Sequence, residues 1–201
     1  MADLYLKRIN YLKNSLKIAI LSYRSAPFGG GQGIYVYELS KVLKELGHQV
    51  DIISGPPYPE LIPGIELIKL PGLNLFSTFK FRDRLDLFLN KKNKSFDDWY
   101  EFGSTLLGGF PELQTFGNRA HSYLLDKTYD VVIDNQSISY GAVKIQDSFP
   151  LVEMMHHPIS KDYYYDLKFA KGILQSISKI RWYSFLKMQK SSAKKINVVV
   201  T

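Results

Sequence analysis

The chain has 201 residues, 45% of them hydrophobic, and a formal net charge of +7. This length suits one α/β domain with its own core. The absence of cysteine excludes disulfides, thiolate metal sites and a cysteine nucleophile, and fits a reducing compartment such as the cytoplasm. No segment approaches the roughly 18 apolar residues of a membrane-spanning helix. The extension 1–16 mixes charged and apolar residues, unlike a signal peptide.

Residues 17–54 have the pattern of a βαβ unit. The runs 18–21 and 50–53 are short and apolar, as is typical of parallel strands that are covered on both faces. Gly47 stands just before the second run, where a left-handed helix cap is expected. Apolar side chains between the runs recur at helical spacing, at Leu39, Val42, Leu43 and Leu46.

A glycine-rich loop lies between the first predicted strand and the helix. It contains Gly29, Gly30, Gly31, Gln32 and Gly33. A loop with few side chains lets backbone N–H groups approach a ligand closely, and the N-terminus of the following helix carries partial positive charge. The loop therefore predicts an anion site, most naturally for a phosphate, although a tight turn with no ligand has the same pattern.

The spacing of the glycines does not match two common phosphate-binding motifs. A dinucleotide fingerprint would need glycine at Ile34 or Val36, and an acidic residue where the second strand ends at Ser54. The sequence also contains no Gly-Lys-Ser/Thr of a P-loop. We therefore favour a phosphate-bearing ligand other than NAD, and disfavour a cofactor-dependent oxidoreductase.

The remaining predicted elements alternate along the chain. Strands are expected at 65–70, 129–135, 151–155 and 196–201, and helices at 111–125 and 140–146. A long helix is predicted from Lys161 onwards, with its core stripe at Ala170, Ile173, Leu174, Ile177, Ile180, Ser184, Phe185 and Met188. The sequence thus predicts one domain with a parallel sheet that ends on a strand, and we expect a longer protein to continue beyond it.

Polar residues follow two of the predicted strands, where ligands of open parallel sheets bind. Asn135 and Gln136 end one strand, and His156 and His157 end another, with Asp162 shortly after. Histidine can act there as a general base or hydrogen-bond donor, while an Asx turn and structural histidines are the alternatives. Adjacent strand residues point in opposite directions, no third ligand is evident, and no Asp-x-Asp occurs. No metal or other cofactor is therefore expected.

Residues 73–110 lack a clean period and are predicted to be an insertion or long loop. This segment combines aromatic and leucine residues with a basic cluster, which consists of Lys80, Arg82, Lys91, Lys92 and Lys94. Apolar anchors with basic residues suit an anionic membrane surface or a lipid-linked substrate. A solvated loop packed on the domain is the alternative. No nucleic-acid-binding motif accompanies the cluster, so nucleic acid is not expected as a partner.

In combination, these motifs resemble the N-terminal domain of retaining glycosyltransferases of family 4, whose GT-B fold consists of two Rossmann-like domains. The resemblance covers about 17–201. It rests on the segments 27–33, 37–39, 46–50, 130–136, 156–158 and 198–201. It implies an α/β, Rossmann-like, doubly wound parallel sheet that forms one of the two domains of a GT-B enzyme.

The resemblance also implies a function. Gly30 and Gly31 match the glycine pair beside the donor diphosphate, and His156 matches the strand-end histidine at the active centre, whereas His157 departs from the family pattern. The domain would bind a glycan or lipid-linked acceptor, with a nucleotide-sugar as the donor. The family's C-terminal donor domain is absent, so this fragment alone is not expected to transfer sugar. The alternative is a stand-alone, non-catalytic binding module for a phosphate-bearing or lipid ligand.

Overall fold

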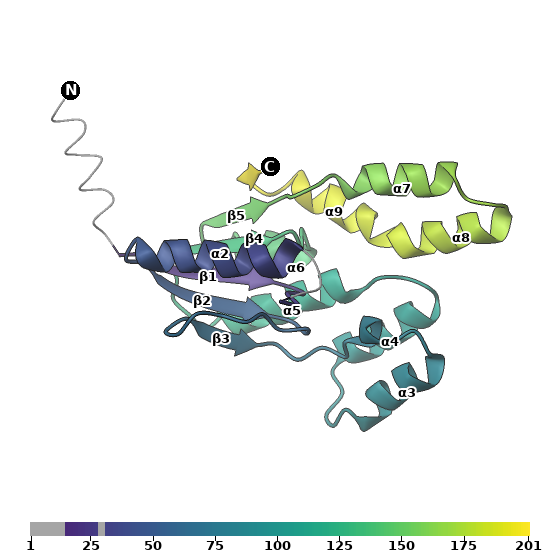
Figure 1. The fold of residues 1–201 in the computed structure, drawn as a ribbon, viewed down its shortest axis with the longest axis horizontal. Helices are drawn as coiled ribbons and strands as arrows, with labels where there is room; N and C mark the ends of the chain where they lie inside the picture. The colour runs from purple at the N-terminus through teal and green to yellow at the C-terminus, as the bar shows by residue number, and fades with distance from the viewer. Residues whose placement is uncertain (1–14, 28–30) are drawn as a thin grey trace.

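The computed structural model describes residues 15–27 and 31–201 (Figure 1). The predicted extension 1–16 lies almost entirely outside the described residues, as do the candidate site residues Gly29 and Gly30.

The described residues form a six-stranded parallel sheet, with the strand order β3-β2-β1-β4-β5-β6. This order is that of a Rossmann-type doubly wound sheet, and it confirms the predicted α/β fold. The strands are β1 (Lys17–Ser22), β2 (Gln49–Ser54), β3 (Glu66–Lys69), β4 (Val131–Asn135), β5 (Leu151–Met154) and β6 (Val199–Val200).

Helices cover both faces of the sheet. This is expected because the strands are apolar without alternation, so side chains on both faces need to be buried. Helix α2 (Gly31–Glu45) packs over Ile18, Ile20 and Ile52 on one face. On the other face, Leu21, Ile53 and Val132 share a core with the helices α5 (Glu112–Leu124) and α6 (Tyr140–Ile145). The short helix α9 (Leu186–Ala193) completes this layer beside α6.

Helix α2 confirms the predicted C-terminal cap and corrects the predicted apolar stripe. Gly47 has a φ angle of 92°, the left-handed conformation that glycine adopts without steric cost. The buried face of the helix contains Val36, with Leu39 and Leu43 packed beside it. In contrast, Val42 and Leu46 are 47% and 61% exposed. The core face of the helix therefore runs along Val36, Leu39 and Leu43.

The segment 73–110 is helical, which corrects the prediction of a long loop. It contains a short 3-10 helix η1 (Leu75–Ser77), followed by α3 (Phe81–Asn90) and α4 (Phe96–Leu106). Leu73, Leu75 and Phe88 form a small core of their own, against which Phe102 packs. Figure 1 shows α3 and α4 together at one end of the molecule, beyond the sheet.

The long helix predicted from Lys161 is in fact several elements. Helices α7 (Ile159–Lys168) and α8 (Ile173–Trp182) form a hairpin, followed by η2 (Tyr183–Phe185) and α9 (Figure 1). The chain reverses before α8 at Gly172, whose φ angle is 89°. As a result, most of the predicted core stripe is solvent-exposed: Ile173 is 78% exposed and Leu174 is 85% exposed.

Candidate functional site

His156 and Asn135 meet at the carboxyl edge of the sheet. The Nε2 atom of His156 lies 2.5 Å from Oδ1 of Asn135, which is itself fully buried. The amide Nδ2 of Asn135 donates in turn to Oγ of Ser22 at the end of β1, at 3.4 Å. The ring of His156 also packs edge-on against Tyr35 of α2, with centroids 4.4 Å apart. His156 therefore bridges the strand ends and the helix that follows the glycine loop.

The hydrogen bond to Asn135 defines which proton His156 holds. Because a carbonyl oxygen only accepts, Nε2 of the neutral ring donates and Nδ1 keeps its lone pair. Burial lowers the pKa of His156, and the neighbouring His157 lowers it further. The ring is therefore neutral at pH 7, with Nδ1 able to accept a proton or a hydrogen bond.

A buried loop follows Asn135 and contains two residues with unusual backbone angles. Gln136 and Ile138 have φ angles of 65° and 47°, in the left-handed region that non-glycine residues seldom adopt. Both are almost fully buried. The loop ends where Oγ of Ser139 accepts from the backbone N–H of Ala142 and caps α6. This arrangement fixes the direction in which Asn135 leaves β4.

Three other predicted site residues form a second group beside His156. The amide of Gln136 lies 3.4 Å from Nδ1 of His157, and Nε2 of His157 lies 3.0 Å from Asp162. His157 and Asp162 are more than half exposed at their side chains. Gln136 and His157 line a pocket of about 120 Å³ that extends toward Gln189 of α9. Asn135, His156 and Asp162 are not among the residues that line this pocket.

The glycine-loop side of the edge holds a larger pocket of about 250 Å³. Gly31, Gln32 and Gly33 of the glycine-rich loop line it. A methyl group on Gly33 would lie 2.3 Å from the carbonyl oxygen of Ala26, so only glycine fits there. Tyr23 and Arg24 complete the wall and were not predicted as site residues. They place a cation near the N-terminus of α2.

Arg24 is held by a buried glutamate at the N-terminus of α5. Its Nη1 lies 2.7 Å from Oε2 of Glu112, while Oε1 of Glu112 has no hydrogen-bond partner among the described residues. Burial raises the pKa of Glu112 to about 7, although the charge of Arg24 opposes this rise. Glu112 also lines a small pocket together with Tyr23, Glu101 of α4 and Arg119 of α5.

Two members of the predicted basic cluster have structural contacts instead of a free surface. Nζ of Lys91 lies 2.6 Å from Oδ1 of the buried Asp98, and Nζ of Lys94 donates to the backbone oxygens of Leu89 and Lys91 at the end of α3. A membrane or acceptor contact through these two lysines stays a prediction. Exposed members of the cluster are Lys80, Arg82 and Lys92.

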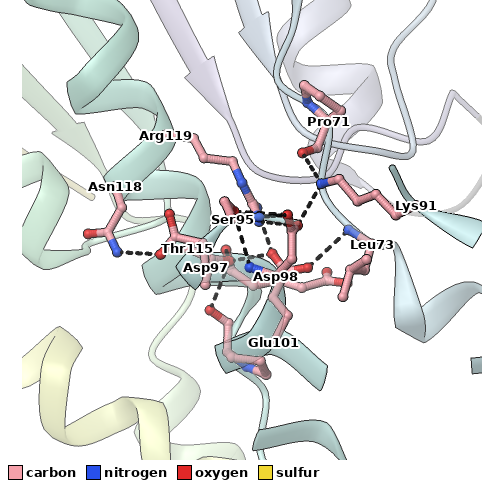
Figure 2. Close-up of polar contacts among 12 residues, drawn as sticks. Pro71, Leu73, Lys91, Ser95, Asp97, Asp98, Glu101, Thr115, Asn118 and Arg119 are labelled. Atoms are coloured by element: carbon pink, nitrogen blue, oxygen red, sulfur yellow. Dashed lines mark hydrogen bonds and ion pairs between the residues drawn. The ribbon is translucent and has the colours of Figure 1, made fainter. Parts of the chain in front are cut away.

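A buried ionic network attaches α4 to α5 (Figure 2). Arg119 donates to Oδ1 of Asp98 at 3.0 Å and to Oε1 of Glu101 at 2.6 Å. Thr115 also donates to Glu101 at 2.6 Å, and the backbone N–H of Leu73 donates to its other oxygen at 3.0 Å. Burial raises the pKa of Asp98, but hydrogen bonds from Lys91 and Ser95 outweigh it and hold that pKa below its usual value.

Within residues 15–27 and 31–201, no group of three or more potential ligands is arranged to hold a metal ion. No helix in this part of the chain is both long and apolar enough to cross a membrane.

Four residues of the site were not predicted from the sequence. Tyr23 and Arg24 directly follow β1, so the strand-end rule that selected Asn135 and His156 would have found them too. Tyr35 and Glu112 enter through tertiary contacts of α2 and α5, for which spacing along the chain gives no signal.

Fold and site together define a Rossmann-like α/β domain with a polar site at the carboxyl edge of its sheet. An MMP alpha-(1->4)-mannosyltransferase of Mycolicibacterium hassiacum is 40% identical to this chain over 190 residues. The match covers 92% of this chain and 45% of that protein, so the chain spans less than half of this relative's length. No family model matches the chain.

Among solved structures, the crystal structure of LpCGTa in complex with UDP is similar over 92% of this chain and 50% of that chain. The two share 11% sequence identity with a TM-score of 0.43, which supports no conclusion about ligands.

Proposed function

We propose that this chain is the N-terminal, acceptor-binding half of a GT-B glycosyltransferase of the family 4 type. The observation that supports it most is the contact between His156 and Asn135 beside the N-terminus of α2, in a chain 40% identical to a mannosyltransferase. The first class of donor to test is therefore a nucleoside diphosphate mannose, with transfer to a glycan acceptor and retention of configuration. A second domain would hold most of the donor.

Each group at the edge of the sheet has a role in this proposal. Transfer from a nucleoside diphosphate sugar releases a diphosphate, and fixed N–H dipoles stabilise the charge that develops on it. The N-terminus of α2 and the guanidinium of Arg24 supply positive potential next to the 250 Å³ pocket. The Nδ1 atom of His156 accepts a hydrogen bond from a sugar hydroxyl and orients the reacting sugar.

The exposed end of α3 suggests how a lipid-linked acceptor would be approached. Phe79 is 94% exposed and Phe81 60% exposed, with Lys80 and Arg82 exposed beside them, and Lys92 is exposed beyond the other end of α3. We propose peripheral contact with an anionic membrane surface at the cytoplasmic side through these residues. Co-sedimentation with vesicles of anionic and of neutral lipid tests it: binding that ignores both lipid charge and salt would contradict this role.

The function is tested with the full-length protein, a panel of nucleoside diphosphate sugars and α-mannoside oligosaccharides as acceptors. The proposal predicts release of a nucleoside diphosphate together with an acceptor one hexose heavier, both measured in one reaction by mass spectrometry. Tight binding of a donor or of a nucleoside diphosphate without any product would instead indicate the non-catalytic binding module.

A further inference from the structure

Two carboxyl groups lie side by side in the sheet, directly below the candidate site. Asp134 of β4 and Glu153 of β5 are paired in register and are both fully buried. Their neighbours in the same row are Leu21 of β1 and Val199 of β6, both apolar. Burying two adjacent negative charges in such a row would be very costly.

The hydrogen bonds around the pair show that a proton is needed. Oδ2 of Asp134 accepts from Oγ of Ser137 at 2.5 Å and from the backbone N–H of Ile138 at 3.3 Å. Oδ1 of Asp134 and both oxygens of Glu153 have no partner in the described part of the chain if both groups are carboxylates. A proton on Glu153 turns it into a donor to Asp134 and provides partners for two of these three oxygens.

Electrostatics indicate which residue keeps the proton. Burial raises the pKa of Glu153 well above its usual value, and the charge of Asp134 raises it further, whereas the nearby backbone N–H groups of Gln136 and Ile138, which form no hydrogen bond with Glu153, oppose the rise. Burial also raises the pKa of Asp134, but the hydrogen bonds from Glu153 and Ser137 oppose this. Glu153 is therefore the acid, and Asp134 the carboxylate.

Charged groups from the surrounding elements do not neutralise the pair. The helices packed over this face contribute Phe116 and Ala120 of α5, Ala142 of α6 and Gln189 of α9, and Gln189 donates to the backbone oxygen of Ser137 at 3.3 Å. Lys144 of α6 and Lys187 and Lys190 of α9 are exposed, and Arg119 of α5 is paired with Asp98 and Glu101. His156 and His157 lie beyond the end of β5, and their contacts are with Asn135, Gln136 and Asp162.

We propose that Asp134 and Glu153 share one proton and act as a positioning unit for His156. Asp134 holds Ser137 and Ile138, which close the left-handed loop after Asn135, and Asn135 in turn orients the ring of His156. The catalytic consequence rests on the proposed function, whereas the shared proton does not.

The shared proton is tested through the pH dependence of unfolding in the full-length protein. Because the pKa of Glu153 in the folded state exceeds its unfolded value near 4.5, its contribution to stability is complete below pH 4.5 and is lost as the pH rises toward the folded value. Glu153→Gln keeps a hydrogen-bond donor toward Asp134 but does not titrate, so this variant should not show that loss of stability with rising pH. The matched control is Asp51→Asn, which changes a buried strand carboxyl that accepts from Tyr129. This variant should still show the loss of stability with rising pH that Glu153 causes in the wild type.

Positioning is tested by comparing Glu153→Gln with Glu153→Leu. The glutamine variant keeps the hydrogen bond to Asp134, so the ring resonances of His156 stay in place and kcat stays within about threefold of wild type. The leucine variant shifts those resonances and lowers kcat at least tenfold, with a smaller change in KM for the donor. The resonances test the positioning even if no sugar transfer is found, a result that would contradict only the proposed function.

Two results would overturn the inference. One is the same pH dependence of unfolding in wild type and Glu153→Gln. The other is a Glu153→Leu protein with unchanged His156 resonances and wild-type kcat. If Glu153→Leu does not fold, the wild-type and Glu153→Gln unfolding curves still decide whether the proton is shared.

Discussion

The Nε2 atom of His156 lies 2.5 Å from Oδ1 of Asn135. This contact links the segment after β5 to the last residue of β4. Replacing the amide by a carboxylate tests this contact. Asn135→Asp places a negative charge beside the ring and stabilises its protonated form, which raises the pKa of His156. The acid limb of the kcat/KM profile should move to higher pH, and for a shift of one unit the loss should approach about tenfold at pH values well below the wild-type limb.

Asn135→Leu serves as the comparison, because it removes the hydrogen bond without adding charge. It should lower kcat/KM at every pH and leave the position of the acid limb nearly unchanged. An Asn135→Asp protein with the wild-type profile would show that this contact does not control the protonation of His156.

Glu112 should make stability fall as the pH rises through the neutral range. Burial raises its pKa from 4.5 to about 7, so the folded protein holds a proton that the unfolded chain releases above pH 4.5. Between pH 4.5 and 7 this should remove about 3 kcal/mol from the free energy of unfolding. Urea unfolding of wild type and Glu112→Gln checks it: the variant should lack this loss, and parallel curves would contradict the burial of a protonated Glu112.

Arg119 should be important for stability because it is paired with two buried carboxylates, Asp98 and Glu101 (Figure 2). Arg119→Ala leaves both without their guanidinium partner and should cost about 3–5 kcal/mol of unfolding free energy. Lys92→Ala, at an exposed position between α3 and α4, should change it by less than about 0.5 kcal/mol. Equal urea midpoints for the two variants would contradict the role of the network.

Helices α5 and α6 approach each other through glycines. A methyl group on Gly141 would lie 2.1 Å from the backbone oxygen of Gly117, so Gly141→Ala should force the helices apart and cost about 1–3 kcal/mol. Gly103 of α4 has open space around it, and Gly103→Ala should stabilise by up to about 1 kcal/mol. Thermal unfolding compares the two, and a Gly141→Ala protein as stable as Gly103→Ala would contradict the close contact.

The sequence predicts the sheet well because its strands are short apolar runs buried on both faces. It places helices less well, since a stripe of apolar residues does not reveal which neighbours it meets. In α2 the predicted stripe included Val42 and Leu46, which are exposed because the helix packs through Val36. Gly172 could have indicated the break before α8, but apolar periodicity continues across it and predicts one long helix.

Site residues can be predicted from the sequence where they lie at the carboxyl end of a predicted strand. Asn135 and His156 follow different strands, yet parallel topology brings their side chains together at one edge. The partnership of Arg24 with Glu112 is different, because it joins a loop after β1 to the start of a helix 88 residues later. No spacing rule connects those positions. The same applies to the shared proton of Asp134 and Glu153, which depends on strand register.

The most direct test of the account is sugar transfer by the full-length protein carrying His156→Ala. His121→Ala is the matched control, because His121 lies on α5, outside the candidate site. We expect His156→Ala to fold normally and to lose at least about 100-fold in kcat, on the order of what removing a positioned catalytic group costs, while His121→Ala transfers sugar at the wild-type rate. Undiminished turnover in His156→Ala would remove this histidine from the active centre.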